Sequence, residues 1–505
     1  MSSKILSAAV VGLDAELVEV EADILNAPLG AFSIVGLPDA AVSESKERVR
    51  SAVKNSGLYF PKRKVTVNLA PADLKKQGPS YDLPIAISIL AATNKIKREN
   101  FDKLLFVGEL ALNGELRPVN GILPIAIKAK EAGLVAMFVP AANAAEAKLV
   151  KELEVIPVNN LVELVAHLED RSAIAAAPYT EFDFANAAID FDMAHIKGQE
   201  HVKRAMEIAA AGAHNVLMVG PPGSGKTLIA RTMPSILPDL SLIEALEITK
   251  IYSVAGELPA STALMTSRPF RSPHHTASGV ALVGGGSWPR PGEISLAHRG
   301  VLFLDEFAEF PRLALENLRQ PLEDGVIHVS RAAQNLSFPA KFILLAASNP
   351  CPCGYLGDRE KNCVCSAGQV MNYKKKISGP ILDRIDLHIE VPRLKFEKLA
   401  SASENETSAR IKARVQTARL KQKERFANSH FITNSEMNSE AVKHFCRVDS
   451  ASTTLLHQAV NQMHLSARAY FRVLKLARTI ADLAAEENIL TSHIAEALQY
   501  RPRVE

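Results

Sequence analysis

The stretch Gly220-Pro-Pro-Gly-Ser-Gly-Lys-Thr227 decides the fold of this chain. It matches the phosphate-loop pattern G-x-x-x-x-G-K-[ST], follows an apolar run at 215–219 and leads into an expected helix from 228. Backbone N–H groups of such a loop surround phosphate oxygens, and the helix N-terminus adds a positive dipole. The residues expected to bind ATP are Gly220, Pro221, Pro222, Gly223, Ser224, Gly225, Lys226 and Thr227. Lys226 is expected on the β- and γ-phosphates and Thr227 on Mg²⁺.

Length and composition restrict the class of protein. With 505 residues the chain is too long for one core, and about three domains are expected. A hydrophobic share of 47%, a charged share of 22% and a net charge of +3 are typical of a soluble globular protein. The apolar run 83–93 is too short to cross a bilayer, and no signal-peptide cleavage site follows Lys4. We therefore expect a cytoplasmic protein without a membrane partner.

Two further apolar runs end in polar residues that suit ATP hydrolysis. Val301-Leu-Phe-Leu-Asp-Glu306 predicts a buried strand, with Asp305 supporting Mg²⁺ through its water shell and Glu306 polarising the attacking water. The run 341–349 predicts another core strand. Its last residue, Asn349, is expected to lie in space between the strand that leads into the phosphate loop and the strand that ends in Asp305 and Glu306. There it would orient the hydrolytic water.

Four of the five cysteines are crowded into one short stretch. Cys351, Cys353, Cys363 and Cys365 form two pairs with prolines and glycines around them, which can supply four sulfur ligands to Zn²⁺. The alternative is a compact loop of reduced thiols. Either interpretation fits a reducing compartment better than a disulfide framework does.

Candidate contacts with nucleic acid lie in two loops and one helix. The stretch 268–293 is rich in Gly and Pro, which predicts loops, and it carries Arg271, Arg290 and Trp288, the only tryptophan. An aromatic ring among arginines suits single-stranded nucleic acid, and the alternative is a tryptophan packed under its own loop. Residues 323–338 predict a β-hairpin with Arg331 near its tip. The basic helix 410–425 is either a solvated face or a second surface for phosphates.

The first part of the chain alternates strand and helix patterns, which predicts an α/β domain. Its segments Gly78-Pro-Ser80 and 108–118 resemble the proteolytic domain of Lon, in which that serine is the nucleophile. The activating lysine of Lon falls at about Leu123 here, although Lys128 and Lys130 lie nearby in the sequence. A serine without a base is a weak nucleophile, so we expect a Lon-like domain without peptidase activity, as in RadA-type recombination proteins.

The predicted fold class is α/β, in three domains with a linker. The Lon-like α/β domain is expected at 1–168, the linker at 169–188, a P-loop ATPase domain with a parallel sheet at 189–392 and a helical lid domain at 393–505.

Together these motifs resemble the YifB/ComM family of magnesium-chelatase-like AAA+ ATPases. The resemblance covers essentially the whole chain. Within it, His195-Ile-Lys-Gly-Gln199 is similar to the segment that packs against adenine. Arg384, in Ser378-Gly-Pro-Ile-Leu-Asp-Arg-Ile-Asp386, takes the position of an arginine finger on the neighbour's γ-phosphate. Arg468 at the start of a late helix, or Arg472 one turn on, would reach a γ-phosphate in cis or in trans.

This resemblance implies a homo-hexameric, DNA-dependent ATPase. Such a motor would use ATP and Mg²⁺ to drive branch migration when single-stranded DNA recombines with the chromosome during natural transformation. Its partners would be single-stranded and branched DNA. Three alternatives remain: a magnesium-chelatase motor subunit acting with metal-insertion partners, a Lon-like protease, and a scaffold without enzymatic activity.

Overall fold

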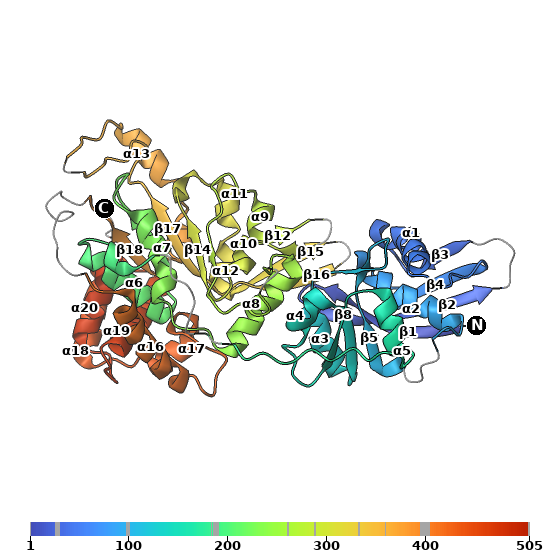
Figure 1. Ribbon diagram of the computed structural model, residues 1–505. Coiled ribbons are helices and arrows are strands. Elements are labelled where there is room, and N and C mark those ends of the chain that lie inside the picture. The colour runs from blue at the N-terminus through green and yellow to red at the C-terminus, as the bar shows by residue number, and fades with distance from the viewer. Residues whose placement is uncertain are drawn as a thin grey trace. The chain divides into compact units, whose positions relative to one another are not determined.

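Figure 1 shows the computed structural model of the chain. It describes residues 2–25, 31–96, 101–182, 184, 191–259, 262–286, 289–331, 334–358, 360–393 and 405–502. The chain divides into two compact units, Met1–Asp183 with Ala245–Met265, and Phe184–Glu244 with Thr266–Glu505. Residues 183 and 185–190, in the stretch predicted as a linker, lie outside the described residues.

The first unit is built on a seven-stranded sheet in the order β3-β4-β2-β1-β5-β8-β9. Its strands are β1 (Ser2–Val11), β2 (Asp14–Leu25), β3 (Phe32–Val35), β4 (Lys64–Ala70), β5 (Leu104–Phe106), β8 (Ala136–Pro140) and β9 (Glu154–Val158). Strand β2 pairs antiparallel with β1 and β4, and the remaining pairs are parallel. A separate small pair joins β6 (Glu109–Leu110) to β7 (Leu116–Arg117).

Helices cover both faces of this sheet. One hydrophobic core contains residues of α1 (Ala40–Asn55), α2 (Asp82–Ala92) and α5 (Leu161–Leu168). The other contains residues of α3 (Ile122–Glu131) and α4 (Ala144–Ala147), with Leu246 of α8 (Leu242–Ala255) packed against it. Short 3-10 turns occur at Pro79–Tyr81, Phe101–Lys103 and Ala141–Asn143. The inclusion of 245–265 in this unit has no signal in the sequence pattern, because those residues follow the phosphate loop along the chain.

The second unit contains a five-stranded parallel sheet in the order β11-β14-β17-β10-β18. Its strands are β10 (Val216–Val219), β11 (Phe270–Arg271), β14 (Val301–Leu304), β17 (Ile343–Ser348) and β18 (Leu387–Glu390). Strand β17 therefore lies between β10 and β14, as predicted for the strand that ends at Asn349. Two antiparallel hairpins accompany the sheet: β12 (Gly284–Gly285) with β13 (Arg290–Pro291), and the predicted hairpin β15 (Val326–Arg331) with β16 (Gln334–Pro339).

The helices of the second unit fall into two sets along the chain. The first set is α6 (Glu200–Gly212), α7 (Lys226–Ile236), α9 (Gly279–Val283), α10 (Glu293–Leu296), α11 (Arg312–Glu316), α12 (Arg319–Asp324), α13 (Ala367–Lys374) and α14 (Gly379–Leu382). The second is α16 (Ser408–Arg425), α17 (Ser439–Phe445), α18 (Ser450–Gln462), α19 (Ala467–Leu483) and α20 (Thr491–Gln499). Single 3-10 turns occur at Met193–His195, Phe307–Glu309 and Asn434–Glu436.

The C-terminal helices share one core with the parallel sheet. Ile411 of α16 and Val473 of α19 belong to the same buried cluster as Val216 of β10 and Leu345 of β17. In Figure 1 these helices, coloured orange to red, lie beside α6 and β18. The predicted fold class is thereby confirmed: an α/β chain with a parallel sheet and a helical C-terminal region. No helix in the described ranges is long and apolar enough to cross a membrane.

The basic helix α16 is held inside its own unit by its cationic side chains. Lys412 Nζ lies 2.5 Å from Asp239 Oδ1. Arg414 pairs with Glu207 and Glu406, Arg425 pairs with Asp482, and Arg419 Nη2 donates to Ala210 O at 3.0 Å. Each of these four residues binds another part of its unit, a contact that neither expected alternative, a solvated face or a phosphate surface, included.

Candidate nucleotide-binding site

The phosphate loop joins the carboxyl end of β10 to the start of α7. Gly223 and Gly225 have φ values of 77° and 88°, in the left-handed region that glycine adopts without steric cost. The N-terminal cap of α7 is Gly225, so the first N–H groups of the helix face the loop. This is the predicted strand, glycine loop and helix, and its geometry suits a triphosphate.

Lys226 connects the loop to Asn349, the residue that follows β17. Its Nζ donates to Gly220 O at 2.7 Å and to Pro221 O at 3.0 Å, and lies 3.4 Å from Asn349 Oδ1. Burial lowers the pKa of Lys226, and the charge of Asp305 opposes that shift. The ammonium group therefore lies among oxygen acceptors, where phosphate oxygens can replace carbonyl groups.

Thr227 and Asp305 bring the two halves of the expected Mg²⁺ site together. Thr227 Oγ1 donates to Asp305 Oδ2 at 2.7 Å, although the two residues are 78 positions apart in the sequence. A threonine hydroxyl and a strand-end aspartate are the oxygen donors that hold Mg²⁺ in P-loop proteins, so the donor set fits the ion.

Glu306 has a partner that the sequence pattern did not indicate. His275 Nδ1 lies 3.0 Å from Glu306 Oε2, and the imidazole is also in edge contact with the Phe310 ring. Glu306 itself has a φ of 51°, an unusual value for a residue with a side chain. Histidine in a loop carries no signal for such a contact, because the loop between β11 and α9 has no regular period.

The segment predicted to pack against adenine contacts the phosphate loop. Gln199 Nε2 donates to Ser224 O at 3.1 Å and to Pro392 O at 2.9 Å. The side chain is 7% exposed, so these bonds are sheltered from water. Gln199 thus joins the loop to the chain that follows β18.

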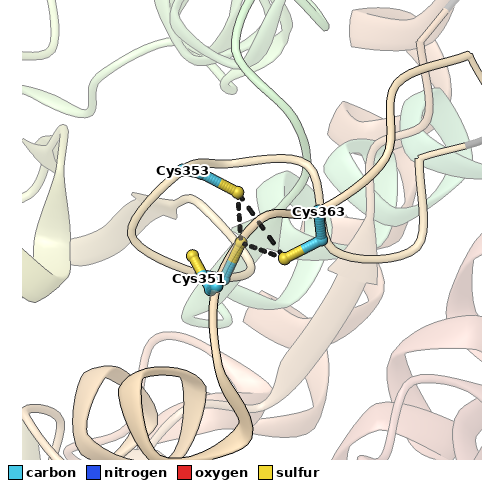
Figure 2. Close-up of side chains that lie close together, drawn as sticks. Cys351, Cys353 and Cys363 are labelled. Carbon is cyan, nitrogen blue, oxygen red and sulfur yellow. Dashed lines mark hydrogen bonds between the residues drawn. The ribbon is translucent and has the colours of Figure 1, made fainter.

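The four clustered cysteines lie directly after Asn349. All four sulfur atoms are within 4.8 Å of one another. Figure 2 shows Cys351, Cys353 and Cys363 with their sulfurs facing each other. The Sγ of Cys351 lies 3.4 Å from that of Cys353 and 3.7 Å from that of Cys363, and the latter two are 3.6 Å apart. Zn–S bonds of about 2.3 Å in a tetrahedron place sulfurs about 3.8 Å apart, so the cluster matches the size of a zinc site. Backbone N–H groups of Tyr355 and Val364 lower the pKa of Cys353 to about 6.

The cysteine loop also touches the phosphate loop. A Cβ placed on Gly354 would lie 2.6 Å from Pro222 Cδ, which is closer than real contacts allow. Only glycine therefore permits this approach. The cysteine loop and the phosphate loop are packed against each other at the point where Asn349 meets Lys226.

Arg384 and Arg468, the two candidates for γ-phosphate contact, meet on one carboxylate. Arg384 Nη2 donates to Glu323 Oε2, and Arg468 Nη2 donates to Glu323 Oε1 at 2.7 Å. Arg472, the second choice in the sequence, instead donates to Arg384 O at 2.8 Å and pairs with Asp386. Arg472 therefore fixes the backbone beside Arg384.

Arg384 lies at the opposite end of the strands from the phosphate loop, although β18 and β10 are neighbours in the sheet. Strand β18 runs parallel to β10, with Leu387 opposite Val216 and Glu390 opposite Val219. Arg384 precedes β18, whereas the phosphate loop follows β10, so the length of β10 separates them by at least about 10 Å. Within this chain Arg384 is therefore separated from the phosphate loop.

The candidate nucleic-acid contacts are described only in part. Arg271 forms a two-bond ion pair with Glu293, with distances of 2.7 Å from Nε and from Nη2. Arg290, in β13, is exposed. Trp288 lies outside the described residues, and so does the side chain of Arg331, whose backbone ends β15 opposite Gln334.

Ser80 lies in the 3-10 turn Pro79–Tyr81 of the first unit. Leu123, at the position expected for the activating lysine, is buried in α3. The two nearby lysines have carboxylate partners: Lys128 Nζ is 3.0 Å from Glu16 and Lys130 Nζ is 2.8 Å from Glu152. This arrangement gives no support to a displaced general base.

Three family descriptions match successive parts of the chain. They are the subunit ChlI of Mg-chelatase at 20–143, the magnesium chelatase subunit ChlI at 192–399, and its C-terminal region at 405–501. Competence protein ComM of Haemophilus influenzae is 44% identical over 509 residues, which cover 99% of this chain and 97% of that protein. The uncharacterized protein YifB of Escherichia coli is 42% identical over 98% of this chain and 96% of that protein. The magnesium-chelatase 38 kDa subunit of Cereibacter sphaeroides is 28% identical over 32% of this chain and 53% of that subunit.

Proposed function

This chain belongs to the YifB/ComM family of magnesium-chelatase-like proteins, and on that premise we propose that it is a ring-forming, ATP-hydrolysing motor that moves DNA strands. The observation that carries the ATPase part is the meeting of Lys226, Thr227, Asp305 and Asn349 at one edge of the parallel sheet. Lys226 and Thr227 begin the helix that follows β10, Asp305 follows β14 and Asn349 follows β17, and these three strands are neighbours in the sheet.

We assign each residue a role that its contacts support. Lys226 would exchange carbonyl oxygens for phosphate oxygens, and Thr227 with Asp305 would hold Mg²⁺, which would supply charge neutralisation when bound. Glu306 accepts a proton from the attacking water, and Asn349 orients that water from the strand between the two. Gln199 fixes the loop from behind through Ser224 O.

The position of Arg384 and Arg468 supports the proposed ring. Arg384 precedes β18 and so lies at the opposite end of the strands from its own phosphate loop, and Arg468 shares Glu323 with it. We propose that both arginines act on the nucleotide of a neighbouring subunit. A contact between two unlike surfaces of successive copies is heterologous, and such contacts form a ring when the rotation between copies closes. We propose a homo-hexamer.

DNA is the proposed substrate, for two reasons. The relative from Haemophilus influenzae is named a competence protein, and Arg331 is the last residue of β15 in the hairpin β15–β16. Arg290 and Trp288 add a cation and an aromatic ring in the neighbouring loop of the sequence. We propose that these groups contact single-stranded and branched DNA during its integration by homologous recombination.

A second candidate function is a magnesium-chelatase motor subunit. It is favoured by the three chelatase family matches and by the partial similarity to the 38 kDa subunit. Such a subunit would hydrolyse ATP with metal-insertion partners and would not respond to DNA.

We also propose that Cys351, Cys353, Cys363 and Cys365 bind one Zn²⁺ ion, because their spacing matches a tetrahedron of thiolates. The site would be structural. It would hold the loop that lies between Asn349 and the contact with Pro222.

The proposal is tested by ATP hydrolysis with and without single-stranded DNA, together with migration of a synthetic three-stranded junction. We expect wild-type protein with ATP and Mg²⁺ to move the junction and its hydrolysis rate to rise with DNA. Lys226→Ala should abolish both, and Glu306→Gln should bind ATP and DNA without movement. A wild-type protein that hydrolyses ATP but neither responds to DNA nor moves the junction would favour the chelatase-type subunit.

A further inference from the structure

Glu323 holds the two arginines that the proposed function assigns to the neighbour's nucleotide. Its Oε1 accepts from Arg468 Nη2 at 2.7 Å, and its Oε2 accepts from Arg384 Nη2. Both guanidinium groups contact one carboxylate, so they lie close enough together to bind one small anion jointly. Carboxylates and phosphates use the same N–H donors of arginine.

We propose that Glu323 is a positioning residue that occupies the place of the neighbouring subunit's γ-phosphate between Arg384 and Arg468 and is displaced by that phosphate. The inference rests on the proposed function, since it requires that the arginines act in trans. While the carboxylate holds them, the two arginines cannot stabilise charge on the neighbour's phosphate. Glu323 therefore limits hydrolysis until the ring is engaged.

The surroundings of Arg384 support an exchange of partners. Arg384 is 7% exposed, and its Nη1 donates to Pro380 O at 2.8 Å. Arg472 holds the backbone through Arg384 O, so the guanidinium is presented from a fixed base. Among the described residues, Arg384 Nε is buried without a hydrogen-bond partner. A phosphate group offers more acceptor oxygens than a carboxylate, so it can satisfy this donor as well.

Glu323 also connects the arginines to the hairpin that is proposed to contact DNA. It lies in α12, which ends at Asp324, and β15 begins at Val326. The base of the hairpin is anchored, because Ile327 is 2% exposed and its partner Phe338 is fully buried. Only Gly325 separates α12 from β15, so we propose that a displacement of the hairpin by DNA is passed to α12 and moves the carboxylate away from Arg384 and Arg468. In this way DNA binding would raise the rate of ATP hydrolysis.

Glu323→Gln tests the inference, because glutamine keeps the shape and removes the charge that competes with phosphate. We expect the DNA-free rate of ATP hydrolysis to rise by at least about threefold, as a charged hydrogen bond becomes a neutral one. Further stimulation by DNA should be smaller than in the wild type. Glu316→Gln is the matched control, because Glu316 pairs with Arg319 on the neighbouring helix and should leave both rates unchanged.

A mixing experiment shows whether the effect reaches the neighbouring subunit. Lys226→Ala subunits bind no ATP and serve only as donors of Arg384 and Arg468, while Arg384→Ala subunits bind ATP and need a donor. We expect donors that carry Glu323→Gln in addition to Lys226→Ala to support faster hydrolysis than donors with Glu323. A purely structural effect inside the mutated subunit would not change the rate at another subunit's nucleotide.

Several outcomes would overturn the inference. The inference is contradicted if Glu323→Gln unfolds at the wild-type temperature and hydrolyses ATP without DNA no faster than the wild type. It is also contradicted if donors with and without Glu323→Gln support the same rate of hydrolysis in the mixtures. If Glu323→Gln does not fold, Glu323→Asp, which keeps the charge but shortens the reach, should raise the rate to a smaller extent, and an unchanged rate counts against the inference. If DNA fails to stimulate the wild type, the proposed function fails, but the DNA-free rates still decide the role of Glu323.

Discussion

His275 Nδ1 lies 3.0 Å from Glu306 Oε2, so the carboxylate expected to polarise water has a partner in its own subunit. The backbone of Glu306 is in the left-handed region at φ 51°, which is strained for a residue with a side chain. His275 follows β11, the strand next to β14, and so reaches the end of the strand that carries Glu306. Two features therefore set the direction of this side chain: the strained backbone and the imidazole.

Glu306→Gln should lower the rate of hydrolysis by about 10²–10⁴-fold with little change in ATP binding, because a general base is lost. His275→Ala should lower the rate by a smaller factor, since it removes only the partner. The double variant should be no slower than Glu306→Gln alone, because the two residues act through one carboxylate. Steady-state hydrolysis and nucleotide binding give both quantities.

Glu309→Gln is the matched control for that series. Glu309 lies three residues on and binds Lys376 at 2.8 Å, so the same substitution should leave hydrolysis near the wild-type rate. An additive loss in the double variant would show that His275 acts on some other step.

Arg384→Ala should bind ATP normally and hydrolyse it about 10³–10⁵-fold more slowly, as expected for the loss of an arginine finger. Mixed with Lys226→Ala subunits, which offer an intact Arg384 but bind no nucleotide, it should regain part of the activity. Hydrolysis across a range of mixing ratios is the measurement. Proven co-assembly without any recovery would place Arg384 on its own subunit's nucleotide instead.

Protein purified without added metal should contain about one zinc ion per chain by elemental analysis. Cys351→Ser should lose the metal and unfold at a lower temperature, because metal binding contributes directly to folding. Cys446→Ser is the control: Cys446 is buried in the C-terminal helices and should keep the full metal content. Metal-free protein of unchanged stability would leave only a loop of reduced thiols.

Asp386 makes the stability of the second unit depend on acid. It is 3% exposed and accepts from Asn215 N at 3.0 Å. Burial alone would raise the pKa of Asp386, but Arg472 and His214 hold it well below its usual range. Because the pKa of Asp386 is lower in the folded than in the unfolded protein, its ionised carboxylate stabilises the fold at pH values above the unfolded pKa of about 4. This stabilisation is lost progressively as the pH falls below that value toward the folded pKa.

Asp386→Asn should therefore lower the free energy of unfolding at neutral pH by about 3–5 kcal/mol, because Arg472 keeps its charge without a partner. The difference from the wild type should shrink as the pH falls below about 4. Chemical denaturation at several pH values measures it. A difference that stays constant down to the lowest pH would show that the carboxylate is not the source.

Binding of single-stranded DNA should tolerate any sequence and fall steeply with salt, because cations that contact phosphates release counterions. Arg331→Ala should reduce the slope of log affinity against log salt. Trp288→Ala should weaken binding by about 1–3 kcal/mol per stacked base and leave that slope unchanged. An unchanged slope for Arg331→Ala would remove the hairpin from the interface.

Local patterns predicted much of the second unit correctly. The phosphate loop, the strand ending at Asp305, the hairpin after Asp324 and the strand ending at Asn349 each combine a short regular element with its end residues. The predicted place of β17 between β14 and β10 also agrees with the structure. A polar residue at the end of this strand can then lie next to the phosphate loop.

Long-range pairings could not be predicted, because they depend on side chains that meet only after folding. The contact of His275 with Glu306 joins residues 31 positions apart (306 − 275) across two strands. The basic helix α16 looked like a surface in the sequence, since nothing there shows that Glu207, Asp239 and Asp482 lie against it. The inclusion of residues 245–265 in the first unit likewise has no local signature.

The parallel sheet gives the chain two unlike ends, with the phosphate loop at the carboxyl end of β10 and Arg384 at the amino end of β18. In the proposed ring, an active site exists only where the arginine end of one copy meets the nucleotide end of the next. A row of subunits that stays open has one site fewer than it has members, and closure creates the last. Two copies joined end to end by identical edges would have none. The number of active sites per subunit would therefore report whether the assembly is closed, because it reaches one only in a closed ring.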